Sequence, residues 1–124
     1  MKSSQPVPNS IVFLYNPDNA NLDIPEWTGS APYEANSGCV CVGTLAEIDG
    51  ATTVELHYPF PTELQADMQL LFEGEIDTPN RQVSINTSQE LDMMSVDVGA
   101  DRSRVKVWAN RMVEPDHIVF GLGG

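Results

Sequence analysis

The sequence predicts an all-β protein, an antiparallel β-sandwich of about eight strands with one long irregular loop. After residue 10, apolar residues recur mostly at every second position, the spacing that places them on one face of a strand. Turn-forming residues separate these runs at intervals of roughly ten residues, as in sandwiches and barrels. The 124 residues have the length of one domain and can bury one hydrophobic core.

The chain divides into a short arm and one folded unit. Residues 1–10 are mostly polar and include two prolines, and we expect them to form a flexible N-terminal arm. Residues 11–124 are expected to form a single β-sandwich domain. Because the first residues lack the apolar core of a secretory signal and no stretch has the length of a membrane span, we expect a cytoplasmic protein, with no membrane partner and with reduced cysteines.

Eight segments have the strand pattern. In chain order they read IVFLYN, GCVCVGTLA, TTVELHYP, MQLLFEGEI, QVSINT, DMMSVDV, SRVKVWAN and HIVFGL, at residues 11–16, 38–46, 52–59, 68–76, 82–87, 92–98, 103–110 and 117–122. The second is apolar on both faces. In the third, fifth and seventh, apolar residues alternate with polar ones, which is typical of a strand with one buried face.

Two segments are harder to assign. In PTELQADMQLLF, Thr62 and Gln65 have capping-box spacing, which favours a helix. From Met68 onward apolar and polar residues alternate, with only Leu71 and Gly74 out of step, so we expect a strand there after one helical turn. The stretch DNANLDIPEWTGSAPYEANS has no clean period. Since prolines and a glycine interrupt it, we expect an irregular loop with one helical turn.

The most sharply defined local structure is a hairpin of DMMSVDV and SRVKVWA. A four-residue loop, Gly99–Arg102, would pair Val98 with Ser103 and set the register. Asp97 would then face Arg104 on a polar side, while the alternating valines and methionines would form a dry side. We expect that dry side to face the core.

The two cysteines lie one residue apart in the second predicted strand. In an extended strand Cys39 and Cys41 point to the same face about 6.6 Å apart, an unfavourable geometry for a disulfide. Together with His57 and His117 they offer four ligands for a tetrahedral metal site. Because the spacing matches no standard zinc motif, we expect both thiols to be core packing, with no metal and no cofactor.

Catalytic motifs are missing from the sequence. It contains no G-x-S-x-G, P-loop, Rossmann glycine set or H-E-x-x-H, and we expect a protein that is not an enzyme. Triads form in space and not in sequence, so a small metal-binding or hydrolytic protein using Cys39, Cys41, His57 and His117 is the alternative.

Charge is the strongest global feature. Eighteen acidic and six basic residues give a formal charge of −12. Such a surface repels nucleic acid and anionic membranes and attracts basic partners. We therefore expect no nucleic-acid partner, and a basic protein surface is the favoured partner. High negative charge also keeps a small protein soluble, which is the structural alternative.

The basic residues are concentrated in one segment. Arg104, Lys106 and Trp108 alternate along one face of the strand at 103–110, and arginine and tryptophan are favoured at the energetic centres of interfaces. We predict binding residues at these three positions and at Trp27. In the structural alternative, the bases neutralise Asp97 and nearby acids across the sheet.

The order of several segments is similar to that of a known family. Glu26-Trp27-Thr28 precedes the strand led by Gly38, and the later segments are SVDVG, RVKVWAN and the apolar IVFGL. This layout, over residues 11–122, resembles the bacterial competence-protein-J family of small acidic inhibitors of a DNA-entry nuclease. The resemblance implies a nuclease-inhibitor-like protein and carries no catalytic residue with it.

Three function classes follow. The first is a non-enzymatic acidic protein that binds a basic partner such as a nuclease, with carboxylates where phosphates would lie. The second is the metal-binding or hydrolytic protein described above. The third is a structural module that self-associates through a sheet edge or the Trp108 face.

Overall fold

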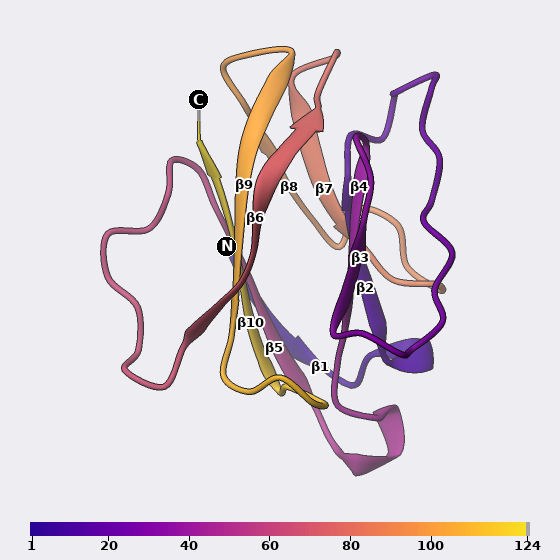
Figure 1. The fold of residues 1–124 in the computed structure, drawn as a ribbon, viewed down its shortest axis with the longest axis vertical. Coiled ribbons are helices and arrows are strands. Elements are labelled where there is room, and N and C mark those ends of the chain that lie inside the picture. The colour runs from indigo at the N-terminus through magenta and orange to yellow at the C-terminus, as the bar shows by residue number, and fades with distance from the viewer. Residues whose placement is uncertain (124) are drawn as a thin grey trace.

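The chain forms two five-stranded β-sheets packed face to face, and the computed structural model describes residues 1–123 (Figure 1). In spatial order, sheet A contains β1 (Lys2–Gln5), β5 (Thr52–His57), β10 (His117–Gly123), β9 (Arg102–Ala109) and β6 (Gln69–Asp77). Sheet B contains β3 (Tyr33–Ala35), β4 (Cys39–Gly43), β2 (Ile11–Tyr15), β7 (Gln82–Asn86) and β8 (Met94–Asp97). Two 3-10 turns, η1 (Pro8–Ser10) and η2 (Glu47–Asp49), complete the structure.

The predicted all-β sandwich is confirmed, with ten strands in place of about eight. Each of the eight predicted segments overlaps one of the strands β2 and β4–β10, with bounds that differ by a few residues. The expected strand from Met68 onward is β6, but the expected helical turns are absent both from the segment before it and from the long loop between β2 and β3. Sheet A is mixed and not purely antiparallel, because β10 runs parallel to β5. Within residues 1–123, no helix is long and apolar enough to cross a membrane.

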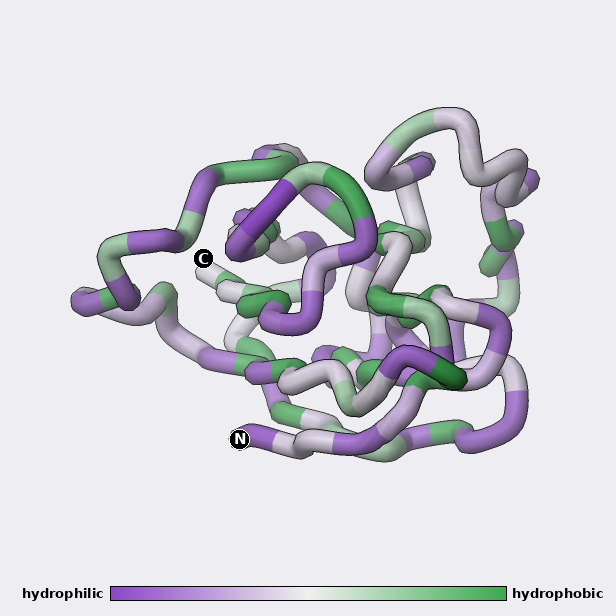
Figure 2. Tube along the Cα trace, turned by 90° about the horizontal axis from the view of Figure 1, so that it is seen from below, coloured by the Kyte–Doolittle hydropathy of each residue, from purple (hydrophilic) through white to green (hydrophobic). Residues whose placement is uncertain are grey.

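The core lies between the inner faces of the two sheets. Its largest fully buried side chains include Leu14 and Ile85 from sheet B, and Leu56, Ile118 and Phe120 from sheet A. Hydrophilic and hydrophobic residues alternate along much of the trace in Figure 2. This period of two is what buries one face of each strand while leaving the other for loops or solvent.

The N-terminal segment differs from the expected flexible arm. Strand β1 pairs antiparallel with β5, with Lys2 opposite Glu55, and the backbones of Met1 and Leu56 exchange hydrogen bonds of 2.9 and 3.0 Å. Val7 is fully buried in the core. The segment is polar because β1 is an edge strand, and polar or charged residues are common at sheet edges.

Two features of the edge strands β3 and β6 are also not visible in the alternation of the sequence. Strand β3 has three residues inside the expected irregular loop, too few to give a pattern. In β6, the register against β9 shifts between Leu70 and Phe72, so Leu71 is the extra residue of a β-bulge. This bulge is why Leu71 breaks the alternation of the strand in the sequence.

The predicted hairpin of residues 92–98 and 103–110 is wrong. Strand β8 pairs with β7 in sheet B, and β9 pairs with β10 and β6 in sheet A. The Val98 amide donates to the carbonyl of Arg81 and the Thr78 amide to the carbonyl of Asp101, so the connection arches from one sheet to the other. The alternation does mark the buried side of each strand, but the two dry sides belong to different sheets and both line the core between them.

We predict that Val7→Ala lowers the free energy of unfolding by about 1–3 kcal/mol, because it leaves a cavity in the core. The matched control is Val113→Ala, since Val113 is 74% exposed and should change stability by under about 0.5 kcal/mol. Urea denaturation of both variants measures the difference. Equal stabilities would show that the N-terminal segment does not pack as described.

Candidate functional site

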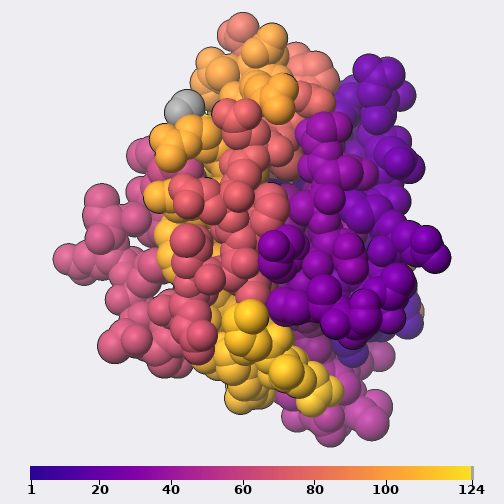
Figure 3. All heavy atoms as spheres, viewed as in Figure 1, coloured from indigo at the N-terminus to yellow at the C-terminus, as the bar shows by residue number. Residues whose placement is uncertain are grey.

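Each outer face of the sandwich is partly covered by a long connection. Leu22 and Trp27, from the segment between β2 and β3, pack on the outer face of sheet B. The segment between β5 and β6 lies on the outer face of sheet A, where it projects from the molecule (Figure 1 and Figure 3). The candidate sites therefore lie where these connections leave side chains accessible.

The cysteines lie on the outer face of sheet B, beneath this first connection. Cys39 and Cys41 are both free thiols without solvent exposure, and their sulfur atoms are 3.9 Å apart. They form a small apolar cluster with Ile11, distinct from the inter-sheet core. The hydrogen bond with Cys41, together with burial, raises the pKa of the Cys39 thiol. Both thiols are therefore packed in an apolar cluster, as the sequence predicts.

The histidines lie on the opposite side of the molecule. Glu55 and His57 share the outer face of β5, and His117 lies on β10 beside them. The Nε2 atoms of His57 and His117 are 3.0 and 2.5 Å from the two carboxylate oxygens of Glu55. The four-residue Cys₂His₂ set of the sequence hypothesis is thus not assembled, because its two halves occupy opposite outer faces. Within residues 1–123, no group of three or more His, Cys, Asp or Glu is arranged to hold a metal ion.

Glu55 is the centre of this histidine pair. Burial raises the pKa of the Glu55 carboxyl, but hydrogen bonds from His117 and His57 outweigh it, so the net shift is downward. A histidine held by a carboxylate is half of a nucleophile-activating set. Among residues 1–123, however, no hydroxyl or thiol is hydrogen-bonded to either imidazole. Sequence spacing alone could have identified Glu55, because it lies two residues from His57 and so on the same strand face.

Three of the four predicted binding residues lie together on the outer face of sheet A. Arg104 and Lys106 on β9 both face Glu73 of β6, at 3.9 and 3.8 Å, and Trp108 follows along the same face. Arg102 pairs with Glu75 at 2.9 Å and with Asp77 at 3.7 Å. The expected cross-strand neutralisation is present, but its acids come from β6 and not from Asp97, because β9 pairs with β6.

The aromatic side chain of Phe60 covers part of the basic stripe, which consists of Arg102, Arg104 and Lys106 on β9. The Phe60 ring lies 5.4 Å from the Arg104 guanidinium carbon and 4.9 Å from the Lys106 nitrogen, within range of cation–π attraction. Phe60 lies so close to β10 that a Cβ at Gly123 would be 2.2 Å from its ring. The bases of β9 are thus already engaged within the molecule.

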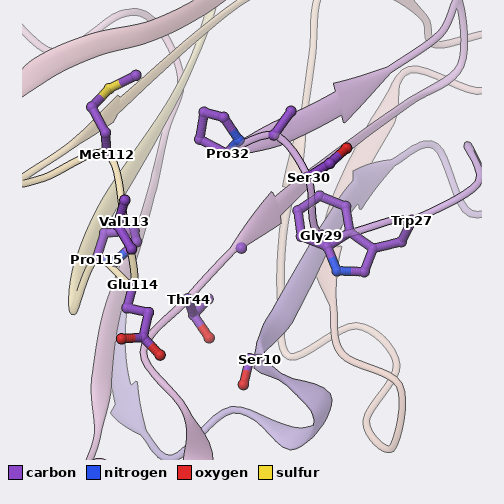
Figure 4. A pocket seen from close by; sticks show the side chains of 12 residues that line it. Ser10, Trp27, Gly29, Ser30, Pro32, Thr44, Met112, Val113, Glu114 and Pro115 are labelled. Atoms are coloured by element: carbon purple, nitrogen blue, oxygen red, sulfur yellow. The ribbon is translucent and has the colours of Figure 1, made fainter.

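The fourth predicted residue, Trp27, lies apart from these three. Its indole packs against Gly43 at the end of β4, where an added Cβ would lie 3.2 Å from the ring. There it forms one wall of a pocket of about 360 Å³. Met112 and Val113, between β9 and β10, form the facing wall (Figure 4). The pocket therefore lies at one end of the sandwich, where segments of both sheets meet.

Polar groups line the floor and rim of the pocket. The hydroxyls come from Ser10, Ser30 and Thr44, and Glu114 is the ionisable side chain among the lining residues. Met112 and Val113 are 50% and 74% exposed, so this wall of the pocket presents apolar surface to solvent. Sequence analysis found Trp27 but missed the facing wall, because its residues lie about 85 positions further along the chain and carry no motif.

The fold and the site define a β-sandwich with an acidic exterior and a pocket at one end. Among solved structures, the chain is similar to ComJ from Bacillus subtilis, an inhibitor of the DNA-degrading activity of NucA. The TM-score is 0.58 at 10% sequence identity, over 100% of this chain and 95% of that chain. The resemblance to the competence-protein-J family is thereby confirmed as a likeness of fold.

Sequence comparison adds no further relative. No protein-family model matches the chain, and no curated protein matches it significantly. At 10% identity the structural likeness concerns the fold, and functional residues have to be inferred from the chain itself.

We predict that Cys39 and Cys41 react with a thiol reagent at least on the order of a hundredfold more slowly in the native protein than in denaturant, because burial keeps them from solvent. Absorbance of the released thiolate of Ellman's reagent at pH 8 measures both rates. Rapid modification of the native protein would contradict the buried cluster.

A second prediction concerns pH. Because the pKa of Glu55 is lowered on folding, its ionised form stabilises the protein above the ordinary glutamate pKa of about 4.3. That stabilisation is lost as the pH falls through the folded-state pKa. Glu55→Gln should therefore cost about 1–2 kcal/mol at pH 7, and the difference from wild type should shrink below about pH 4.3.

Denaturation at several pH values tests this expectation. Glu63→Gln is the control, because Glu63 is exposed, and its difference from wild type should stay near zero throughout. A stability difference for Glu55→Gln that does not change with pH would contradict the role of the ionised carboxylate.

Proposed function

We propose that this protein is a non-enzymatic inhibitor that binds a basic protein surface, of the kind a DNA-degrading nuclease presents. The observation that carries the proposal is the surplus of carboxylates without a basic partner. The likeness of fold to a nuclease inhibitor supports it. In this view the sandwich is a rigid support, and the protein inhibits its partner by binding to it and not by catalysing a reaction.

The surplus follows from the ion pairs within the molecule. Among residues 1–123, five of the 18 acidic residues lie within 4.0 Å of a basic nitrogen. Four of the six lysines and arginines are used in these pairs. Most of the carboxylates are therefore available to a partner, and the bases offer little compensation.

A nuclease that degrades DNA has to attract phosphates, so its substrate groove favours negative charge. The same positively charged groove attracts an acidic protein. Complementary charge raises association rates by roughly 10- to 1,000-fold at low salt. Such binding needs shape and charge but no catalytic group. This fits a chain in which the thiols are buried and the imidazoles are bound to Glu55.

The self-assembly hypothesis rests on the sheet edges and on Trp108. Sheet A ends at β1 and β6, and sheet B ends at β3 and β8. Strands β1, β3 and β8 are short, with four, three and four residues, and short edge strands disfavour edge-to-edge pairing. The longer edge strand β6, with nine residues, carries a bulge at Leu71 and the acidic residues Glu73 and Glu75, which also oppose such pairing. We therefore rank binding of a basic partner above self-assembly.

We predict that the protein inhibits DNA degradation by a NucA-type nuclease when present in molar excess. The association rate should fall by at least about tenfold between 0.05 and 0.5 M salt, because salt screens the attraction between exposed charges. Fluorescent DNA cleavage measures inhibition, and surface plasmon resonance measures the rate. A lack of inhibition, or an association rate independent of salt, would contradict the proposal.

A further inference from the structure

We infer that the pocket between Trp27 and Met112–Val113 receives an arginine side chain of the basic partner. This inference rests on the proposed function and adds to it a particular contact surface. The acidic exterior explains attraction but not where the partner docks. The pocket offers a partner a concave, largely apolar site with one carboxylate among its lining residues.

The shape of the pocket suits one long side chain. Its volume of about 360 Å³ is at the small end of ligand pockets, too small for a folded element but ample for an arginine with its neighbouring backbone. One wall is the flat indole of Trp27, and the other is the aliphatic surface of Met112 and Val113 (Figure 4). The methylene groups of an arginine would be covered on both sides.

The chemistry of the pocket favours a positively charged group. A planar guanidinium stacks on aromatic rings, and tryptophan gives the strongest cation–π attraction. Glu114 supplies a carboxylate among the lining residues, and Ser10, Ser30 and Thr44 supply hydroxyl oxygens that accept hydrogen bonds. An acidic side chain would meet Glu114 and the charge of −12 and would be repelled.

One base of this chain lies near the site. The Nε of Arg111 donates to the backbone carbonyl of Glu114 at 3.0 Å, and its guanidinium lies 4.0 Å from the carboxylate of Asp116. Arg111 is therefore bound to the backbone and to a different carboxylate. The side chain of Glu114 forms no ion pair within residues 1–123, so its charge is free to meet a partner.

The pocket is preorganised by backbone hydrogen bonds from both sheets. The Gly43 amide donates to the carbonyl of Pro32 at 3.1 Å, and the Leu45 amide donates to that of Pro115 at 2.9 Å. These bonds tie the segment that carries Trp27 and the segment that carries Val113 to the end of β4 and the residues that follow it. Because the backbone of both walls is held before binding, less conformational entropy is lost when the pocket is filled.

The test uses two exposed positions that do not affect the core. Glu114→Gln removes the carboxylate, and Val113→Lys places a positive charge at the rim. The matched control is Glu63→Gln, which removes the same charge from the exposed segment on sheet A. Affinity for a NucA-type nuclease is measured by surface plasmon resonance. We expect the dissociation constant to rise about tenfold for the first two variants and less than twofold for the control.

A second measurement does not depend on the nuclease. The peptide acetyl-Gly-Arg-Gly-amide is titrated into the 15N-labelled protein, and the indole N–H signal of Trp27 is followed by NMR. The citrulline peptide, which has nearly the same shape without the charge, is the comparison. We expect the arginine peptide to shift the Trp27 signal at millimolar concentration and the citrulline peptide to bind at least several-fold more weakly.

The outcomes separate this inference from the proposed function. If the nuclease binds the two pocket variants as well as it binds wild type, the pocket inference is wrong while the inhibitor proposal stands. If wild type does not bind the nuclease, the inhibitor proposal fails and the peptide titration decides. A Trp27 signal that is unchanged by the arginine peptide, or equally shifted by both peptides, would then overturn the inference.

Discussion

The structure depends on the burial of two apolar sheet faces against each other. Leu14 and Ile85 of sheet B and Phe120 and Ile118 of sheet A have no solvent exposure. Removal of this surface from water is the main favourable contribution to folding. This burial also determines which side chains of each strand point inward, because a shift of one position would exchange the inner and outer faces. The outer faces, and with them the charges, are arranged around this constraint.

Each outer face is completed in a different way. On sheet B, a long connection covers a small cluster that includes both thiols. On sheet A, ion pairs between β9 and β6 and the ring of Phe60 occupy the basic stripe. Exposed pairs of this kind contribute about 0–1 kcal/mol each, so their main effect is on charge distribution. They leave an exterior dominated by carboxylates, with an apolar pocket where the sheets meet.

The alternation of apolar residues in the sequence predicted where the strands lie, but it did not predict which strands pair with each other. It located eight strands, because alternation reports which residues face the core. It missed β1, whose polar residues Lys2–Gln5 lie at a sheet edge, and it joined β8 to β9 across the short link at Gly99. Alternation is the same whether two strands pair in one sheet or face each other across the core. The pocket was beyond sequence analysis for a related reason, since its walls at Trp27 and Val113 are brought together only by the fold.

If the proposals above hold, a basic partner binds at the end of the sandwich that holds Trp27. Hydrogen–deuterium exchange of the free protein and of its complex with a NucA-type nuclease at low salt locates the bound surface. We expect slower exchange on binding in residues 27–31, 43–45 and 111–114. Slower exchange confined to the outer face of sheet A, in residues 102–108, would show that the partner binds elsewhere.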